Sequence, residues 1–148
     1  MNDFKPGLEG IVAVETEIAE PDREGGTLRY RGIDITELVG HYPYENVWGL
    51  LVDDDLESVM PAPEPYEPAG LTGNAPADLQ AETARLAGLW KLGKLNEISD
   101  EQAREDLGRI SAQMMGIVAR SARIADGHTD TISDDVVARG KTTAEKFL

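Results

Sequence analysis

Hydrophobic positions divide the chain into a strand-like beginning and a helical remainder. Residues 10–18, GIVAVETEI, are rich in β-branched residues, with Val12, Val14 and Ile18 on one alternating face and Ile11 and Ala13 on the other, which predicts a strand. Residues 27–32, TLRYRG, follow a turn-rich stretch and place Leu28 and Tyr30 on one face. We therefore expect residues 1–33 to form a β-hairpin segment that packs on other elements, because an isolated hairpin is marginally stable in water.

The other face of the second predicted strand carries Arg29 and Arg31, in a chain that is otherwise acidic. The first strand offers Glu15 and Glu17, which we interpret as its solvated face rather than a catalytic pair. We expect the two arginines to pair with this acidic face and not to hold a substrate.

Helical patterns fill the remainder. Residues 34–59 predict two short helices, the first capped by Asp34 and the second spanning 44–53, YENVWGLLVD. Residues 60–75 are rich in proline and predict an irregular connection. Residues 76–148 predict further helices, so the fold class is mainly α with a small N-terminal β-hairpin.

The strongest helix signal covers residues 99–127. Ser99 and Gln102 have the spacing of a capping box, and Gly127 suits the C-terminal end. The predicted apolar stripe consists of Ala103, Leu107, Ile110, Met114, Ile117 and Val118. The preceding helix is expected to bury Leu79, Thr83, Leu86, Leu89 and Trp90.

A last helix is expected to start near Ser133. Its pattern continues to Phe147 and Leu148 without Gly, Asn or Pro as a stop signal. Two interpretations are open on this pattern: a C-terminal helix docked on the rest of the fold, or a chain cut short.

The amino-acid composition argues against several classes of function. The 148 residues hold 14 Lys and Arg against 28 Asp and Glu, a formal net charge of −14. This balance argues against nucleic-acid binding and against docking on an anionic membrane. There is no cysteine, and we find neither a signal-peptide pattern nor an apolar run of membrane-spanning length, so a cytoplasmic protein is expected.

The polar residues do not form a complete generic active site. His41 and His128 each follow a glycine after a helix, which is ordinary for a surface histidine. Asp126 and Asp130 flank His128 too loosely to predict a metal site, and the run of aspartates at 53–55 lacks the glycine of a calcium loop. We therefore predict no catalytic and no metal-ligating residue in this chain.

Arg120 and Arg123 lie about one turn apart near the end of the strongest helix. Arginines there complement the negative helix end, and this structural role is the simpler interpretation. Arg123 could alternatively bind a phosphate through two hydrogen bonds. The neighbouring Met114 and Met115 are interpreted as core filling.

Three ordered blocks resemble the N-terminal region of citrate synthases. They are GLEGIVAVETEI (7–18), GGTLRYRGIDITEL (25–38) and YENVWGLLVD (44–53). The phrases TEIAEPD and VWGLLVD, with the proline-rich segment after them, look most similar to the actinobacterial-type "citrate synthase 2" branch of that family. Residues 76–148 resemble this branch more loosely but without a break.

The resemblance implies a mostly helical, homodimeric acyltransferase of the tricarboxylic acid cycle. It would condense acetyl-coenzyme A with oxaloacetate, or propionyl-coenzyme A in methylcitrate relatives, with no permanently bound cofactor. The family's catalytic histidines and aspartate would lie beyond Leu148, so His41 and His128 receive no such role. The resemblance also implies that the catalytic half is absent, and that the chain is a fragment inactive by itself.

The resemblance bears on two coenzyme A contacts of the family. Arg123, in IVARSAR (117–123), takes the place of an arginine that some members direct at the phosphates of coenzyme A. A second family arginine has no equivalent, because Pro6 occupies its position beside Lys5.

The alternative hypothesis for the function of this chain is a non-catalytic helical module that pairs with itself or with a full-length synthase.

Overall fold

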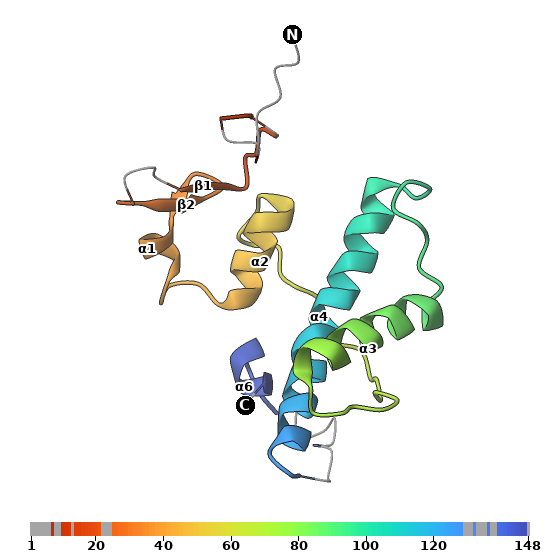
Figure 1. Cartoon of the computed structure of the whole chain (residues 1–148). Coiled ribbons are helices and arrows are strands. Elements are labelled where there is room, and N and C mark those ends of the chain that lie inside the picture. Colours follow the sequence, from red (N-terminus) through yellow and green to blue (C-terminus); the bar gives the residue numbers. More distant parts are fainter. Residues whose placement is uncertain are drawn as a thin grey trace. The chain divides into compact units, whose positions relative to one another are not determined.

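The computed structural model describes residues 7, 10–12, 14–21, 25–128, 132, 136 and 139–147. The chain divides into two compact units, Met1–His41 and Tyr42–Leu148, and each is described by itself. Figure 1 shows the elements coloured along the sequence. In the described part of the chain, no helix is both long and apolar enough to cross a membrane.

A small antiparallel sheet forms the first unit. Its strands are β1 (Ala19–Pro21), β2 (Leu28–Tyr30) and β3 (Ile33–Asp34), in the spatial order β1-β2-β3. Arg31 and Gly32 join β2 to β3 with φ angles of 49° and 81°, as a two-residue hairpin turn requires. The sheet has three strands where the sequence predicted a two-stranded hairpin.

The predicted strand at 10–18 is wrong. Its described residues form no ladder, and the side chains of Val12 and Val14 are exposed. Ala19 pairs with Tyr30, and the last ladder bond runs from the Arg31 amide to the Ile18 carbonyl, 3.0 Å away. The described residues before Ile18 have no partner in this ladder, because the chain turns back at Arg31 into β3.

The arginines of this hairpin pair with carboxylates, as expected. Arg29 lies 3.7 Å from Glu20, which is its cross-strand neighbour, and Arg31 lies 3.9 Å from Glu17. Arg31 belongs to the turn and is largely buried, so its predicted outward orientation is wrong.

A short helix, α1 (Ile35–Leu38), follows β3 directly. The Asp34 side chain accepts from the Thr36 amide at 2.9 Å, which confirms the predicted N-cap. Leu38 is the buried side chain of this helix.

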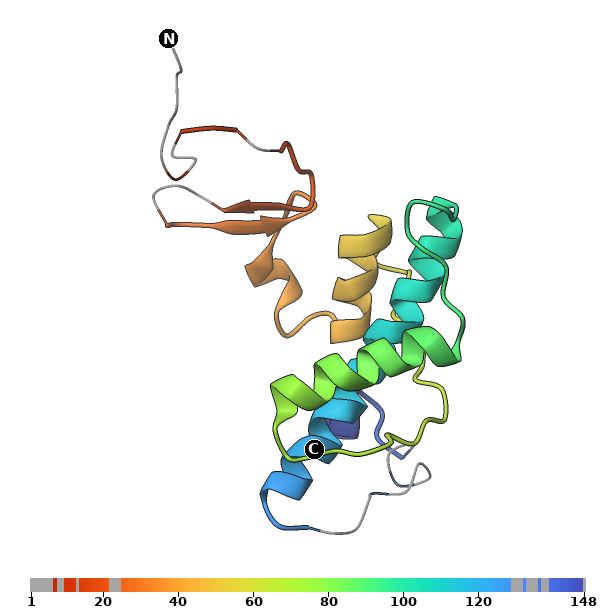
Figure 2. The same cartoon turned by 45° about the vertical axis from the view of Figure 1, so that its right-hand side comes forward.

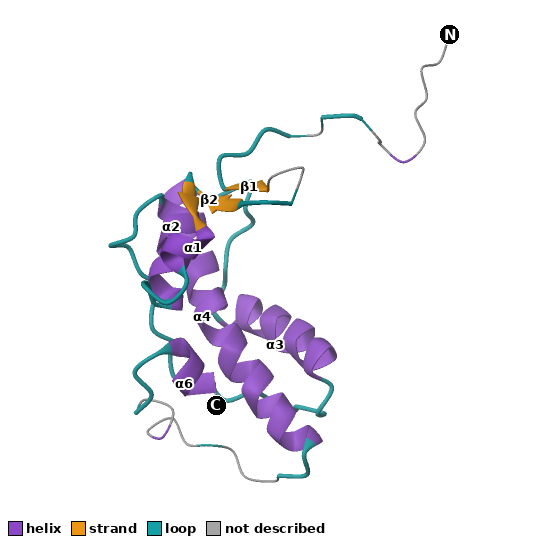
Figure 3. Cartoon of the chain, turned by 90° about the vertical axis from the view of Figure 1, so that its left-hand side faces the viewer, coloured by secondary structure: helices purple, strands orange, loops and turns teal. Residues whose placement is uncertain are grey.

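The second unit is helical, with α2 (Tyr44–Asp53), α3 (Ala75–Leu89), α4 (Asp100–Ala125) and α6 (Thr143–Phe147). The helix at 44–53 and the helix after Ser99 match their predicted positions, and residues 60–70 are irregular as predicted. α3 packs against α4 (Figure 2), and α6 also packs against α4 (Figure 3). The predicted helix start at Ser133 lies outside the described residues.

The core of this unit is small and contains polar groups. Tyr66, Leu86 and Ile117 form its buried centre, with Leu71, Leu79, Trp90 and Ile110 packed against it. The predicted stripes are only partly right, because Leu89, Leu107 and Met114 are exposed. The buried face of α4 instead includes Asp106, Gly108, Ala112, Gln113, Ile117 and Ser121.

The N-terminus of α4 is capped as predicted, but not by a reciprocal pair. Ser99 Oγ accepts from the Gln102 amide at 3.2 Å. The Gln102 side chain turns forward and donates to Asp106 Oδ1 at 2.9 Å, because Asp106 lies one turn further along the buried side of the helix.

Candidate functional site

The second unit contains a groove of about 630 Å³. One side is the proline-rich stretch 59–66, and another is the 112–123 part of α4. The groove is also lined by Pro43, Glu45 and Asn46 at the start of α2, together with Lys141 and Thr143 at the start of α6. Most of the described lining residues are apolar or proline, namely Pro43, Val59, Met60, Pro61, Ala62, Pro63, Pro65, Ala112, Met115, Ile117, Ala119 and Ile132.

Among the described residues that line this apolar groove, three side chains are cationic: Arg120, Arg123 and Lys141. Two carboxylates line it as well, and both accept hydrogen bonds within the protein. Glu64 accepts from Arg109 at 2.6 and 3.2 Å, and Glu45 accepts from the backbone and hydroxyl of Thr143. With three cations against two carboxylates, the described lining is net cationic in a chain with a net charge of −14, which favours an anionic ligand that also carries apolar groups.

Side chains of α4 hold the proline-rich side of the groove in place. Gln113 Nε2 donates to the Glu64 carbonyl at 2.7 Å, and Arg120 Nη1 donates to the Tyr66 carbonyl at 2.5 Å. Proline has no amide hydrogen, so a proline-rich segment cannot form a full backbone ladder. Long polar side chains from the facing helix satisfy its carbonyls instead.

Tyr66 ties the same segment to α3. Its hydroxyl donates to the buried carboxylate of Glu82, and Arg85 stacks over its ring at 5.0 Å from the centroid. Burial, followed by the hydrogen bond to Glu82, raises the pKa of Tyr66 to about 12. Tyr66 thus stays protonated and keeps donating at physiological pH.

The other end of the groove depends on the first turn of α6. Thr142 Oγ1 accepts from the Glu145 amide at 3.1 Å, and Glu145 accepts from the Thr142 amide at 3.3 Å, which is a reciprocal capping box. Glu45 of α2 accepts from the Thr143 amide at 2.7 Å. These bonds fix the backbone next to Lys141.

The structure brings only some of the sequence candidates together. Arg120 and Arg123 both line the groove, and Met115 lines it as well, whereas Met114 is exposed. His41 and His128 are exposed and belong to different units. Lys5, Pro6 and Asp130 lie outside the described residues.

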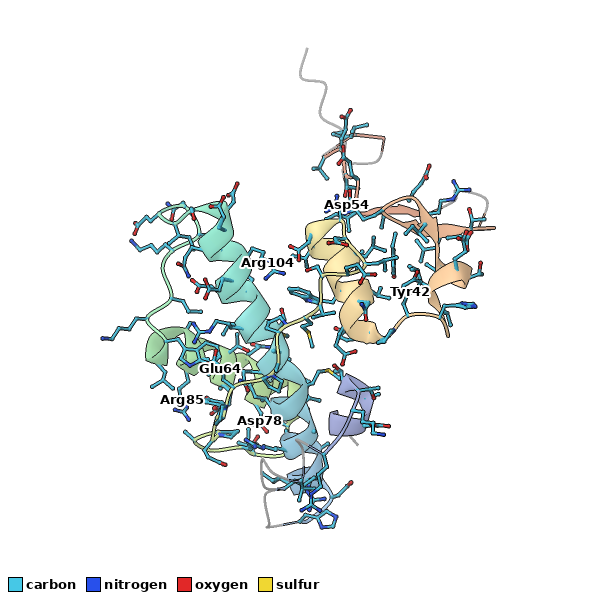
Figure 4. All side chains as sticks on the ribbon, turned by 180° about the vertical axis from the view of Figure 1, so that it is seen from behind. Tyr42, Asp54, Glu64, Asp78, Arg85 and Arg104 are labelled. Carbon is cyan, nitrogen blue, oxygen red and sulfur yellow. The ribbon has the colours of Figure 1, made fainter. Side chains whose placement is uncertain are left out.

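Metal ligation has no support among the residues that the structure describes. They include no group of three or more His, Cys, Asp and Glu side chains placed to hold an ion. Of the three aspartates at 53–55, Asp53 is bound by Arg104 (Figure 4 labels Arg104 on α4), while Asp54 is the C-cap residue of α2. Asp53 and Asp54 therefore lie at the C-terminal end of α2, and Asp55 follows it.

Lys141 and Gln113 were not predicted as groove residues. For Gln113, a signal existed: it lies four residues before Ile117 on the face that also carries Arg120 and Ser121. Lys141 gave no such signal, because its position depends on how α6 folds back onto α4.

Comparison with known proteins places these observations in a family. The family model described as "Citrate synthase, C-terminal domain" matches residues 7–148. Proteins named "Putative citrate synthase 2" from Mycobacterium bovis and Mycobacterium tuberculosis are 46% identical over 122 residues, which is 82% of this chain and 33% of theirs. A "Citrate synthase" from Acidithiobacillus ferridurans is 43% identical over 54 residues, covering 36% of this chain and 14% of that protein.

The chain thus spans about a third of the length of the mycobacterial relatives that it matches. The match to the family model extends over both units, from the glycine-rich N-terminal block to the end of α6. This chain belongs to the citrate synthase family.

Proposed function

We propose that this chain supplies part of a citrate synthase-type acyltransferase that uses a coenzyme A thioester and oxaloacetate. In that reaction the thioester methyl loses a proton and forms a carbon–carbon bond with the ketone carbon of oxaloacetate. Water then hydrolyses the thioester and releases coenzyme A. Propionyl-coenzyme A is the alternative acyl donor.

The observation that supports this proposal is that the chain belongs to the citrate synthase family and also has a cationic groove. Coenzyme A combines several phosphate charges with a long, weakly polar pantetheine arm. The groove offers Arg120, Arg123 and Lys141 beside an apolar, proline-rich lining, which suits both parts. Arg123, in the last turn of α4, is the proposed phosphate contact.

The chain is proposed to bind this substrate without turning it over. Stabilising an enol or a polarised ketone requires hydrogen-bond donors held in a site from which water is excluded. His41 and His128 are both exposed, so neither offers that environment. We propose that catalysis depends on residues other than the described ones, in a cytoplasmic, homodimeric enzyme.

Titration calorimetry of the 148-residue chain with coenzyme A tests the binding step. Arg123→Ala is expected to weaken binding about tenfold or more, because hydrogen bonds to charged groups contribute roughly 1.5–3 kcal/mol. Dephospho-coenzyme A and pantetheine should bind progressively more weakly, and added salt should weaken coenzyme A binding. Arg29→Ala is the matched control, since it removes the same charge from the first unit.

Equal affinities for coenzyme A and pantetheine would contradict the phosphate contact. A thiol-release assay with acetyl-coenzyme A and oxaloacetate completes the test. We expect no turnover. Measurable turnover by the purified chain would contradict the proposal that catalysis depends on residues other than the described ones.

The second candidate is a non-catalytic module that pairs with itself or with a longer synthase. The observation in its favour is the exposed apolar stretch before β1, where Val12 and Val14 are 81% and 77% exposed. Light scattering distinguishes the two functions. A dimer that neither binds coenzyme A nor releases thiol would favour the module, whereas coenzyme A binding favours the enzyme segment.

A further inference from the structure

Two carboxylates on α3 are buried beneath the C-terminal half of α4. Asp78 and Glu82 lie one helical turn apart and are only 3% and 5% exposed. Burying a carboxylate costs free energy unless hydrogen bonds replace its hydration. The partners of these two side chains therefore indicate what they do in the fold.

Asp78 connects the loop before α3 with α4. Its carboxylate accepts from the Thr72 amide at 3.0 Å, the Thr72 hydroxyl at 2.7 Å and the Gly73 amide at 3.0 Å. It also accepts from the hydroxyl of Ser121, which is completely buried in α4, at 2.5 Å. Figure 4 labels Asp78 beside this end of α4.

The loop at Gly73 touches the last residue of α4 directly. Gly73 has a φ of +85°, and a Cβ atom there would lie 3.0 Å from the Ala125 backbone nitrogen. A glycine is needed both for this backbone conformation and for this close approach. Asp78 thus holds the loop against the final turn of α4, the turn that carries Arg123.

Glu82 reaches α4 through Tyr66. It accepts from the Tyr66 hydroxyl and from the Ala69 amide at 3.2 Å, while the Tyr66 carbonyl accepts from Arg120 at 2.5 Å. Arg85 adds a bond to Glu82 at 3.3 Å. The second carboxylate therefore fixes the segment to which Arg120 is bonded.

We propose that Asp78 and Glu82 are positioning residues that set the placement of Arg123 and Arg120 in the groove. Neither carboxylate lines the groove, and each acts through an intermediate residue, Ser121 for Asp78 and Tyr66 for Glu82. The inference rests on the proposed function, because the ligand whose affinity reports the placement is coenzyme A.

A double-mutant cycle on coenzyme A affinity tests the positioning role. Asp78→Asn keeps the side-chain shape but directs amide hydrogens at the amide groups of Thr72 and Gly73. We expect it to weaken coenzyme A binding about 3- to 30-fold in the otherwise unchanged chain. In the Arg123→Ala background the same substitution should change affinity by less than about twofold, because the group that it positions is gone.

Matched variants keep the experiment decisive. Ser121→Ala removes only the contact with α4 and should reproduce a smaller part of the effect, so it carries the test if Asp78→Asn does not fold. Glu105→Gln removes an exposed carboxylate of α4 and should leave affinity within about twofold. An equal loss of affinity from Asp78→Asn with and without Arg123 would overturn the proposal.

Amide hydrogen exchange separates this proposal from the proposed function. Asp78→Asn should speed exchange at 119–125, the end of α4, by about tenfold or more, with little change at 103–110. If the unchanged chain does not bind coenzyme A, the proposed function fails while this exchange pattern still supports the positioning role. Unchanged exchange at 119–125 would overturn the role of Asp78 whether or not coenzyme A binds.

Discussion

Asp53 stabilises the contact between α2 and α4 through charge-assisted hydrogen bonds. Arg104 donates from Nε to Oδ1 at 2.9 Å and from Nη2 to Oδ2 at 2.5 Å, and Ser58 also donates to this carboxylate. Arg104 stacks over the ring of Trp48, 5.5 Å from its centroid. Led by the Arg104 hydrogen bond, these contacts lower the pKa of Asp53 to about 2.

Asp53→Asn should lower the free energy of unfolding by about 1–2 kcal/mol at pH 7, since water still reaches 40% of the Arg104 side chain. The folded-state pKa is depressed below the ordinary 3.8, so the contribution is present above that value and is lost as pH falls toward 2. Urea denaturation at pH 7 and at about pH 2.5 measures both points. Asp54→Asn is the control, because Asp54 has a φ of 58°, which asparagine tolerates. A deficit that persists undiminished at the acidic pH would contradict the ion pair.

The sequence alone could not show that Asp53, rather than one of the two aspartates after it, forms this ion pair. All three aspartates lie at the end of the same predicted helix, and nothing in their local pattern distinguishes one from another. The partner that distinguishes Asp53 lies 51 residues away. Its identity follows from how α2 packs beside α4, which local spacing does not specify.

At the level of elements, local signals predicted the positions of helices better than their buried faces. Ser99 caps α4 through a bond to the amide three residues further on, so sequence spacing was sufficient to predict it. Asn74 caps α3 through a bond of the same spacing, although it was not predicted. The buried face of α4 was predicted as apolar, yet Leu107 is 52% exposed and Ser121 is completely buried. A polar side chain of α4 can be buried in place of an apolar one because polar partners on α3 bind it. These partners come from another part of the chain, so the local pattern of α4 does not reveal them.

Gly49 marks the tightest approach of α2 to the connection that follows it. A Cβ at Gly49 would lie 1.9 Å from the Ser58 carbonyl oxygen and 2.5 Å from its carbon. These are backbone atoms, so they cannot move aside as a side chain does. We expect Gly49→Ala to destabilise the chain by about 3 kcal/mol or more, as overpacking does in other well-packed sites.

Gly88→Ala is the matched control for this substitution. Gly88 lies in α3, and a Cβ atom added to it would meet no heavy atom within 4 Å. Alanine should stabilise the helix there by about 0.5–1 kcal/mol. Thermal and urea denaturation of both variants measure the contrast, and similar effects from the two substitutions would show that Gly49 is not closely packed.

At the level of the whole molecule, the mainly helical fold class could be predicted, whereas the third strand and the groove could not. Arg123 was a candidate site residue only because of the family resemblance. Its spacing in the sequence favoured a structural role at the helix end. The groove itself combines the stretch 59–66, α4 and Lys141, which are far apart in sequence. The net charge of −14 gives no indication that one groove has a cationic lining.

The two units differ in how much core each contains. Leu38 is the buried residue among the described residues of Met1–His41, whereas Tyr66, Leu86 and Ile117 form a buried cluster within Tyr42–Leu148. A small sheet needs a hydrophobic face packed on other elements to be stable. We therefore expect residues 42–148 to fold without the first unit, and residues 1–41 to lack a cooperative transition by themselves.

Separate expression of residues 42–148 and 1–41 tests this difference. The longer piece should keep helical circular dichroism, a single cooperative urea transition and its affinity for coenzyme A, because every described residue that lines the groove belongs to it. The shorter piece should show a gradual, non-cooperative change with urea, as expected for a sheet with little buried surface. A broad transition for residues 42–148 would mean that their helical core depends on the first 41 residues. A cooperative transition with lost coenzyme A binding would instead mean that the groove needs side chains from the sheet.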